Sequence, residues 1–551
     1  MPTISISRQV FEKLVGKKLP LEKLKDRISM LGTDLEEVSD NDITVEVFPN
    51  RPDMLSVQGF ARAFSSFIGA NTGLREFKVE SSKEKMIVEG SVADVRPYTA
   101  CAIVKNLHFD DEKIKEVIDM QEKLHITYGR HRKKAAIGIY PFEKIKTPIR
   151  FLAQDPKEIV FQPLESGREM NALEILEEHP AGKAYGHLLH GKKKFPVFRD
   201  ANNEVLSVPP IINSQKTGKI SEKTKEVFIE CSGFDFRVLQ KCLNMIVTSL
   251  SDMGGKIYSM DIICGSKKYV TPNLAPDEMK VDINYINKLL GLSLKENEIK
   301  KLLERMGYGF KDKKALIPSY RADILHQVDL AEDIAIAHGY ENFEALIPNV
   351  ATIAEENEFE KFKGKISILL AGSGLIEAST YHLTNKEIQR GKMNAEMPLI
   401  DLANSISSDY NVLRAWVLPS LMEVLSNNKH HEYPQKIFTM GTIFKKISEN
   451  DTNISEKQRL AVAIASEKAD YTEIRQMLDY IFRSIGVSHE IAEAEHSSFI
   501  IGRVSRASVN GKKIAYLGEI TPKVLSNWGI EVPVAALELN LMELYEIIKK
   551  A

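Results

Sequence analysis

Cysteines are few in this sequence, and none stands at a spacing that binds zinc. The 551 residues include four cysteines with no C-x-x-C pair among them: Cys101, Cys231, Cys242 and Cys264. This spacing excludes a zinc finger, and the low count excludes a small scaffold held together by disulfides. We therefore expect reduced thiols in a cytosolic protein.

Long hydrophobic runs and a large net charge are also missing. The opening segment, MPTISISRQVFEKLVGKKLP, has no apolar core of signal-peptide length, and no run approaches the length that spans a membrane. A formal net charge of −2 argues against a protein that wraps nucleic acid over its whole surface, so such contacts would require a local basic patch. We expect a soluble cytoplasmic chain with no membrane partner.

The composition is that of an ordinary folded protein with several cores. Hydrophobic residues make up 43% and charged residues 27% of the chain, and its length predicts roughly three to five domains. One early helix carries Ile114, Val117, Ile118 and Gln121 in register and ends at the basic turn YGRHRKK. No internal repeat or long low-complexity linker is present.

A compact segment at 271–347 contains two short predicted helices. The first ends at Gly291, and the second begins with a capping-box pattern, Ser293 with Glu296, and ends at Gly307. A strand at ALIPSY follows. The two helices and this strand together resemble a helix-turn-helix or winged-helix arrangement. Most helix pairs of this kind never contact nucleic acid, so the pattern alone does not assign that role.

Four carboxylates follow in PSYRADILHQVDLAEDIAIAHGY, residues 318–340. Asp329, Glu332 and Asp333 stand at i, i+3 and i+4 and share one face of a predicted helix at about 326–338, and Asp323 lies just before it. Two interpretations remain open. The carboxylates cap the helix and complement its dipole in solvent, or they supply oxygen ligands to a hydrated Mg²⁺.

Six ordered blocks carry a resemblance to a known family: NRPDMLSVQGFARA, QEKLHITYGRHRKKAAIGI, LSVPPIINS, the 318–340 block, LRAWVLPSLMEVLSNNK and YLGEITPKVL. Over essentially its full length the chain resembles the archaeal and eukaryotic β subunits of phenylalanine–tRNA ligase. The resemblance implies a multidomain α+β fold with four parts. These are an N-terminal mixed module (1–85), an editing domain (86–270), a winged-helix-like Mg²⁺-binding unit (271–347) and a class II synthetase-like antiparallel-sheet domain without catalytic arginines (355–551).

The resemblance also implies an activity and partners. Such a chain works in an α2β2 heterotetramer that attaches phenylalanine to its tRNA with ATP, and the α subunit holds the synthetic site. In the family, the carboxylates that match Asp323, Asp329, Glu332 and Asp333 bind Mg²⁺. The implied partners are therefore the α subunit and the tRNA for phenylalanine, and the implied cofactor is Mg²⁺.

The family's editing domain hydrolyses tRNA mischarged with tyrosine. Ser207, Glu230 and Ser232 stand where the family places polar pocket residues, and Phe198 stands at an apolar lining position. The sequence departs from the family at two places: ECS replaces the more usual Asp-x-Thr, and IGIYPFE replaces a run that contains His and Asp. Ser207, just before Pro209, could also be only a turn residue.

Positive charges give two further expectations. The cluster Arg130, His131, Arg132, Lys133 and Lys134 is either a phosphate contact or a solvated turn. In the C-terminal part, IFTMGTIF (437–444) and VAALELNLMEL (534–544) match strands in which active domains of the family carry ATP-binding arginines, and neither contains one. Arg414 and Arg503 lie outside these strands, where we expect structural or interfacial roles.

Two alternatives to the ligase and editing functions remain open. They are a scaffold subunit with a decayed editing pocket and a free-standing deacylase of mischarged tRNA.

Overall fold

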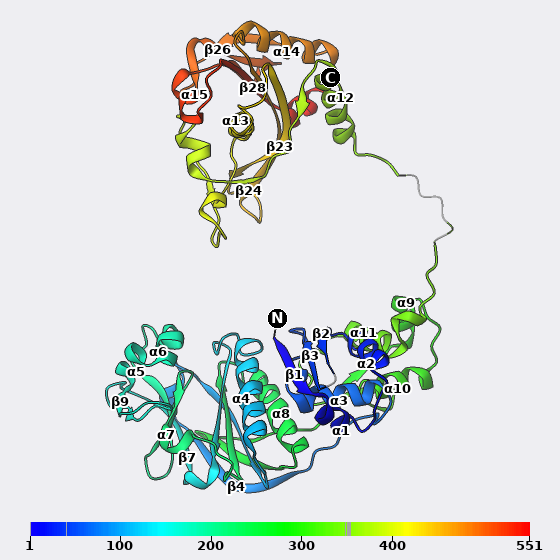
Figure 1. Cartoon of the computed structure of the whole chain (residues 1–551), viewed down its shortest axis with the longest axis vertical. Coiled ribbons are helices and arrows are strands. Elements are labelled where there is room, and N and C mark those ends of the chain that lie inside the picture. The colour runs from blue at the N-terminus through cyan, green and yellow to red at the C-terminus, as the bar shows by residue number, and fades with distance from the viewer. Residues whose placement is uncertain (1, 40, 348, 350–353, 551) are drawn as a thin grey trace. The chain divides into compact units, whose positions relative to one another are not determined.

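The computed structural model describes residues 2–39, 41–347, 349 and 354–550 (Figure 1). The chain forms two compact units, residues 1–347 and 348–551. No helix in the described part of the chain is both long and apolar enough to cross a membrane. The multidomain α+β fold predicted from the sequence is confirmed.

The first unit begins with a small three-stranded antiparallel sheet backed by helices. Its strand order is β1-β3-β2. Phe11 packs against Phe60 and Phe64 with ring centroids 5.4 and 5.2 Å apart, which joins the first helix to the third. The elements are β1 Thr3–Ser7, α1 Arg8–Val15, α2 Leu21–Met30, β2 Asp34–Val38, β3 Asp42–Glu46 and α3 Val57–Phe67.

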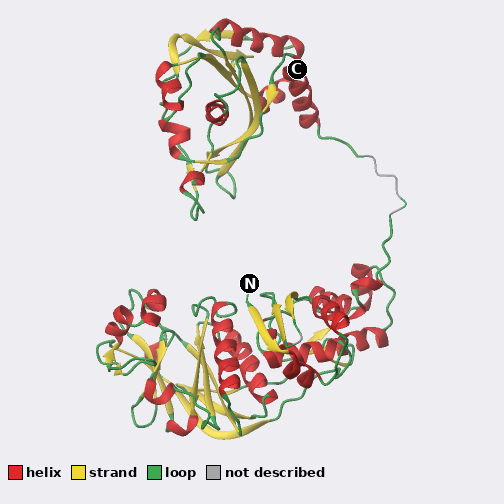
Figure 2. Ribbon diagram, in the orientation of Figure 1, coloured by secondary structure: helices red, strands yellow, loops and turns green. Residues whose placement is uncertain are grey.

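A ten-stranded mixed sheet forms one side of the first unit (Figure 2). Its path runs β12-β11-β10-β7-β4-β14-β5-β13-β6, with β15 paired to β14, so β6 is an edge strand. Its strands are β4 Val79–Val88, β5 Tyr98–Lys105, β6 Ala135–Pro141, β7 Ile149–Gln154, β10 Phe195–Arg199, β11 Val205–Val208, β12 Ile212–Asn213, β13 Val227–Gly233, β14 Lys256–Cys264 and β15 Lys267–Thr271.

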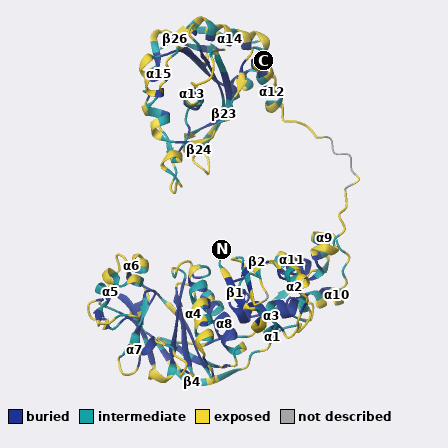
Figure 3. Ribbon diagram, viewed as in Figure 1, coloured by how far each residue is buried: buried dark blue, intermediate teal, exposed yellow. Residues whose placement is uncertain are grey.

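Helices cover the two faces of this sheet unequally, and the central strands are buried (Figure 3). The long helices α4 and α8 pack on one face, where their apolar side chains share a single core with the N-terminal elements. The other face has its own core, built around the β7-β10-β11 strands. The helices of this part are α4 Asp111–Ile126, α5 Ala172–Glu178, α6 Pro180–Tyr185, α7 Gln215–Gly218 and α8 Phe236–Asp252.

The last part of the first unit is a three-stranded antiparallel sheet with three helices. The predicted helices here are confirmed: α9 Ile283–Leu290, α10 Glu296–Arg305 and α11 Gln327–His338; the strands are β16 Asp277–Lys280, β17 Gly309–Lys311 and β18 Lys314–Ile317. The predicted capping box of Ser293 with Glu296 is wrong. Helix α10 begins two residues further on, where the backbone N–H of Lys295 donates to the carboxylate of Glu298.

The second unit is built on a seven-stranded sheet of order β19-β23-β24-β28-β27-β26-β25. All pairs are antiparallel except β19 with β23. Helices α12, α14 and α16 pack against one face and α13 and α15 against the other, and Figure 1 shows α13 within the curve of the sheet. The main elements are α12 Glu358–Gly372, β19 Ile376–Glu377, α13 Leu418–Asn427, β23 Gln435–Lys446, β24 Ile454–Ala465, α14 Tyr471–Ser484, β25 Glu490–Glu493, β26 Phe499–Val509, β27 Lys512–Ile520, α15 Pro522–Trp528, β28 Val534–Asn540 and α16 Leu541–Lys550.

Candidate functional site

A cavity of about 380 Å³ opens along β6, the edge strand of the large sheet. Side chains of helix α4 form hydrogen bonds with backbone groups on the unpaired edge of this strand. Gln121 Nε2 donates to the carbonyl of Ile137 at 3.0 Å, and the Ile137 N–H donates to His125 Nε2 at 2.8 Å. Because that nitrogen accepts, the ring of His125 is neutral, and burial lowers its pKa. His125 therefore acts as a structural partner of the strand.

Four polar side chains from different strands meet at this cavity. The hydroxyl of Tyr140 lies 2.8 Å from Oγ of Ser207, 3.2 Å from Oε1 of Glu230 and 3.3 Å from Oδ1 of Asn213. Ser207, Glu230 and Asn213 line the cavity. The structure thus brings together two of the residues singled out in the sequence and adds Tyr140, which sequence reasoning noted only as part of a departure from the family.

Gly138 makes room for this cluster. It pairs with Glu230 across β6 and β13, so the two residues lie side by side. A Cβ atom at position 138 would lie 2.2 Å from the hydroxyl of Tyr140 and 2.6 Å from Oε1 of Glu230, closer than van der Waals contact allows. Glycine at this position therefore lets Tyr140 and Glu230 lie where they do, and a larger residue would displace their side chains.

Glu230 is a buried carboxyl group with one unused oxygen. Burial raises its pKa to about 8, although Arg96 and the hydrogen bond from Tyr140 oppose this shift. Arg96 is buried too, and its burial lowers the pKa of its guanidinium to about 10. Oε2 of Glu230 has no hydrogen-bond partner within the described structure. At neutral pH the side chain is therefore largely a carboxylic acid, which can donate a hydrogen bond as well as accept one.

The other two residues proposed for this pocket lie behind its wall. Ser232 is fully buried, and Arg96 Nε donates to its Oγ at 3.1 Å while Arg96 Nη2 donates to its carbonyl at 2.6 Å. Phe198 stacks on Phe151 at 4.2 Å in the second core of the domain. Neither is among the residues that line the cavity. The apolar lining comes instead from Ile114 and Ile118 of α4, from β6 and from the segment around residues 209–212.

The basic turn after α4 is a strained loop beside the cavity. Arg130, His131 and Arg132 have consecutive positive φ angles of 49°, 53° and 64°. Arg132 is engaged within the protein, because its guanidinium donates to the carbonyl of Ile211 at 2.9 Å and to Glu122 at 2.8 Å. Arg130, His131 and Lys133 are exposed. A phosphate contact therefore stays a prediction for these three exposed residues.

The carboxylates predicted to bind Mg²⁺ do not all point outward. Asp333 is buried, and its Oδ2 accepts from the hydroxyl of Tyr308 at 2.5 Å and lies 2.8 Å from Nη2 of Arg321. Asp323 forms a bidentate ion pair with the same guanidinium. Nε of Arg321 donates to its Oδ1 at 2.8 Å, and Nη2 donates to its Oδ2 at 2.7 Å. Although Asp323 is largely buried, Arg321 and Arg51 hold its pKa below the ordinary value. The interpretation that these carboxylates complement the helix dipole in solvent is therefore wrong for Asp333, which Tyr308 and Arg321 hold inward.

The other two carboxylates have separate partners. Oδ2 of Asp329 accepts the backbone N–H groups of Leu325 and His326, both at 2.7 Å, and so caps α11. Glu332 is exposed, and its Oε1 accepts from the hydroxyl of Tyr340 at 2.8 Å. In this arrangement the four carboxylates do not form a ligand set for a cation. The Mg²⁺ site stays a prediction, and a cation would have to displace at least one of these contacts.

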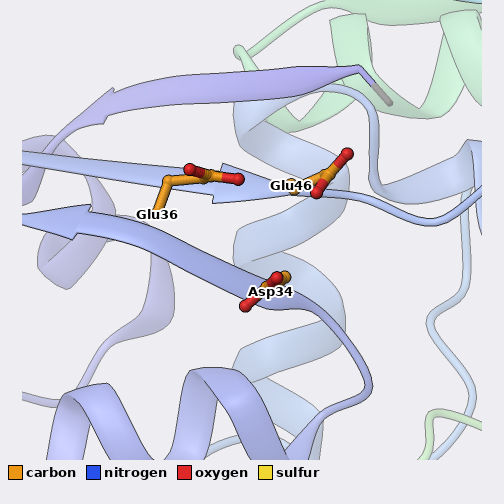
Figure 4. Close-up of side chains that lie close together, drawn as sticks. All are labelled: Asp34, Glu36 and Glu46. Atoms are coloured by element: carbon orange, nitrogen blue, oxygen red, sulfur yellow. The ribbon is translucent and has the colours of Figure 1, made fainter. Parts of the chain in front are cut away.

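Carboxylates do gather at another place in the first unit. Among the described residues, Asp34, Glu36 and Glu46 of strands β2 and β3 place oxygen atoms within 4.8 Å of one another (Figure 4). Asp34 and Glu36 are exposed. Exposed acidic groups on paired strands commonly occur without a metal, so the trio assigns no function.

In the second unit, the two arginines noted in the sequence are held by the protein. Arg414 is fully buried over Gly441, and its Nε donates to the carbonyl of Thr442 at 2.7 Å. Arg503 pairs with Glu519 at 2.6 Å. The sequence reasoning overlooked two arginines that lie on the sheet itself, Arg459 in β24 and Arg506 in β26.

Comparisons with known proteins place this chain among the synthetases. Residues 344–541 match the family described as "Phenylalanyl tRNA synthetase beta chain CLM domain", 279–340 match the "tRNA synthetase B5 domain" and 104–248 match the "B3/4 domain". These ranges include most of the C-terminal unit, the carboxylate segment and most strands of the sheet that carries the cavity.

Relatives that match over the whole chain show which family of synthetases it belongs to. The chain is 42% identical to a phenylalanine–tRNA ligase beta subunit of Pyrococcus abyssi, over 99% of this chain and 100% of that one. It is 37% identical to one of Archaeoglobus fulgidus over 99% of both chains. A crystal structure of an N-terminal fragment of the beta subunit from Pyrococcus horikoshii matches with a TM-score of 0.59 and 37% identity, over 61% of this chain and 99% of the fragment. The chain belongs to the phenylalanine–tRNA ligase beta subunit family of aminoacyl-tRNA synthetases.

Proposed function

We propose that this chain is the β subunit of an α2β2 ligase that attaches phenylalanine to its tRNA with ATP and Mg²⁺. Full-length similarity to named beta subunits supports this role. We place the synthetic site on the α subunit. This is supported by the two strands discussed above, since residues 437–444 and 534–544 contain no arginine to bind ATP phosphates.

Phenylalanine-dependent exchange of pyrophosphate into ATP tests this assignment. The full chain purified alone should show no exchange, and addition of the α subunit should restore it. Exchange by the chain alone that persists when trace α subunit is replaced by an inactive variant would contradict the assignment. Co-purification of the two chains separates a ligase subunit from a free-standing deacylase.

We further propose that the cavity along β6 hydrolyses tRNA mischarged with tyrosine. The observation that carries this proposal is the unpartnered Oε2 of Glu230 in the wall of a cavity of about 380 Å³. Tyrosine differs from phenylalanine by one hydroxyl, and an apolar synthetic pocket rejects an added hydroxyl only weakly. A second site with an unsatisfied buried polar group favours tyrosine, because only tyrosine can satisfy that group.

Each polar residue then has a role in binding the substrate. Glu230, as a carboxylic acid, donates to the phenol oxygen, and Ser207 supplies a second hydrogen-bonding group. Tyr140 touches both residues and holds them in place. Ser232 accepts from Arg96, and both residues lower the pKa of Glu230 against the effect of burial. Apolar side chains of α4, of β6 and of residues 209–212 supply the wall for the aromatic ring.

One observation favours the alternative of a scaffold subunit whose editing has decayed. The phenol hydroxyl of Tyr140 already occupies hydrogen-bonding positions on Ser207 and Glu230 that a substrate tyrosine would use. A deacylation assay separates the two possibilities. The complex should release tyrosine from tyrosine-charged tRNA faster than the uncatalysed reaction and leave phenylalanine-charged tRNA intact, whereas a decayed pocket would leave both unchanged.

A further inference from the structure

The face of the second-unit sheet that packs against α13 contains a cavity of about 350 Å³. Five cationic side chains line it: Lys445, Lys457, Arg459, Arg506 and Lys513. They come from four strands, β23, β24, β26 and β27. The pairing of the strands sets Arg506, Tyr516 and Glu538 in one row across the sheet. The sheet itself therefore brings the positive charges together.

The carboxyl groups of the cavity do not balance these charges. Only Glu538 and Glu543 line it. Oε2 of Glu538 accepts the backbone N–H groups of Val417 and Leu418 at the start of α13, at 3.1 and 2.9 Å. Glu543 accepts from the side chain of Asn540 at 2.8 Å. The one ion pair is the long contact of 3.5 Å between Arg459 and Glu538.

The cations consequently have unused donors. Within the described chain, Lys445, Lys457 and Lys513 have no carboxylate within 4.0 Å of their ammonium groups. The Nε–H groups of Arg459 and Arg506 are buried and have no hydrogen-bond partner. Burial, followed by the positive charges of Arg459 and Lys457, lowers the pKa of Lys445. Like charges held this close raise the free energy of the folded state until an anion joins them.

We propose that this cavity binds a phosphate-bearing ligand. The donor set is that of phosphate sites: guanidinium groups with free N–H donors, beside lysines that act as mobile point charges. A compact anion with several charges fits the volume and the number of cations, and it can be a free polyphosphate or the backbone of an RNA. The inference does not depend on the editing proposal, because the two cavities lie in different units of the chain.

Binding of defined phosphate probes to the full chain tests the proposal. Pyrophosphate and a single-stranded RNA oligonucleotide are each titrated by calorimetry against the wild-type chain and two variants. The first variant, Lys457→Gln with Lys513→Gln, removes two exposed cations that make no internal ion pair. The second, Arg506→Gln, removes an unpartnered Nε–H. The matched control, Lys468→Gln with Lys549→Gln, removes two exposed lysines of the same unit outside the cavity.

We expect at least one probe to bind the wild type and the control equally, and both cavity variants to bind it tenfold or more weakly. If pyrophosphate binds, the ligand is a free polyphosphate. If only RNA binds, and its affinity falls steeply with salt, the ligand is an RNA backbone. No binding of either probe at millimolar concentration, or binding that the cavity variants leave unchanged, would overturn the proposal. Circular dichroism of each variant verifies that its fold is intact.

Discussion

The hydroxyl of Tyr140 lies 2.8 Å from Oγ of Ser207, although the two residues are 67 positions apart in the chain. Tyr140 is the last residue but one of the edge strand β6, and Ser207 belongs to β11, near the other end of the order of strands in the sheet. The sheet brings both hydroxyl groups to Glu230, and Ser207 and Glu230 line the cavity. Tyr140 contacts both Ser207 and Glu230, so it controls the positions in which these two side chains meet a ligand.

Replacement of Tyr140 by phenylalanine tests this control. Tyr140→Phe keeps the ring that stacks on Phe228 at 5.7 Å and removes only the hydroxyl. If Tyr140 positions Ser207 and Glu230, the hydrolysis of tyrosine-charged tRNA should fall about tenfold, which corresponds to one lost hydrogen bond of about 1.4 kcal/mol. A faster reaction in this variant would show instead that the hydroxyl blocks the pocket.

The raised pKa of Glu230 predicts a specific pH dependence. The folded-state pKa of about 8 lies above the ordinary carboxyl value of 4.5, so the folded protein keeps a proton there that the unfolded chain releases. Stability should therefore fall as pH rises from about 5 to 8. Glu230→Gln keeps the shape and cannot ionise, so its melting temperature should exceed that of the wild type by more at pH 8 than at pH 5. The upper limit is roughly 5 kcal/mol, at about 1.4 kcal/mol per pKa unit.

The same group should impose a pH dependence on editing. If the carboxylic acid donates to the substrate, the preference for tyrosine-charged over phenylalanine-charged tRNA should decline above pH 8 in the wild type. The Glu230→Gln variant keeps a donor and should hold its preference constant over that range. A wild-type preference that rises with pH would contradict the donor role.

Sequence reasoning succeeded where periodicity decides the structure and failed where partners come from other elements. The three helices from Ile283 to His338 follow from their apolar spacing. The inward turn of Asp333 does not, because it depends on Tyr308 and Arg321 in neighbouring segments. The role of Tyr140 likewise depends on strand register: β6 and β13 pair so that Gly138, the neighbour of Glu230, shares a face with Tyr140. No spacing in the sequence reveals that register.

Arg321 should be essential to the stability of the carboxylate segment. It is buried and balances Asp323 and Asp333 at 2.7 and 2.8 Å, and these two carboxylates raise its pKa well above the ordinary value against the effect of burial. Arg321→Met leaves two carboxylates without their partner and should lower the free energy of unfolding by about 3–5 kcal/mol. Arg503→Met, which removes an exposed arginine from its pair with Glu519, should lower the free energy of unfolding far less, because solvent screens that pair. Equal effects in urea denaturation would argue against the buried pairing.

The magnesium prediction has its own test. A cation that binds only the folded state raises the melting temperature by mass action. We expect the full chain to melt at a higher temperature in millimolar Mg²⁺ than with a chelator, and Glu332→Gln to abolish the difference. Glu332 is suited to this test because it is exposed and its loss leaves the pairs of Arg321 intact. Identical melting with and without Mg²⁺ would contradict the predicted cation site.

The most direct test of the editing pocket is the rate at which the complex hydrolyses tyrosine-charged tRNA. Ser207→Ala and Glu230→Ala each remove one polar group of the cavity, and each should slow hydrolysis about tenfold or more, for a loss of about 1–3 kcal/mol. Charging with phenylalanine should change little, and Glu177→Ala, an exposed carboxylate of the same domain, should behave as the wild type. Unchanged hydrolysis in both pocket variants would contradict the assignment of this cavity.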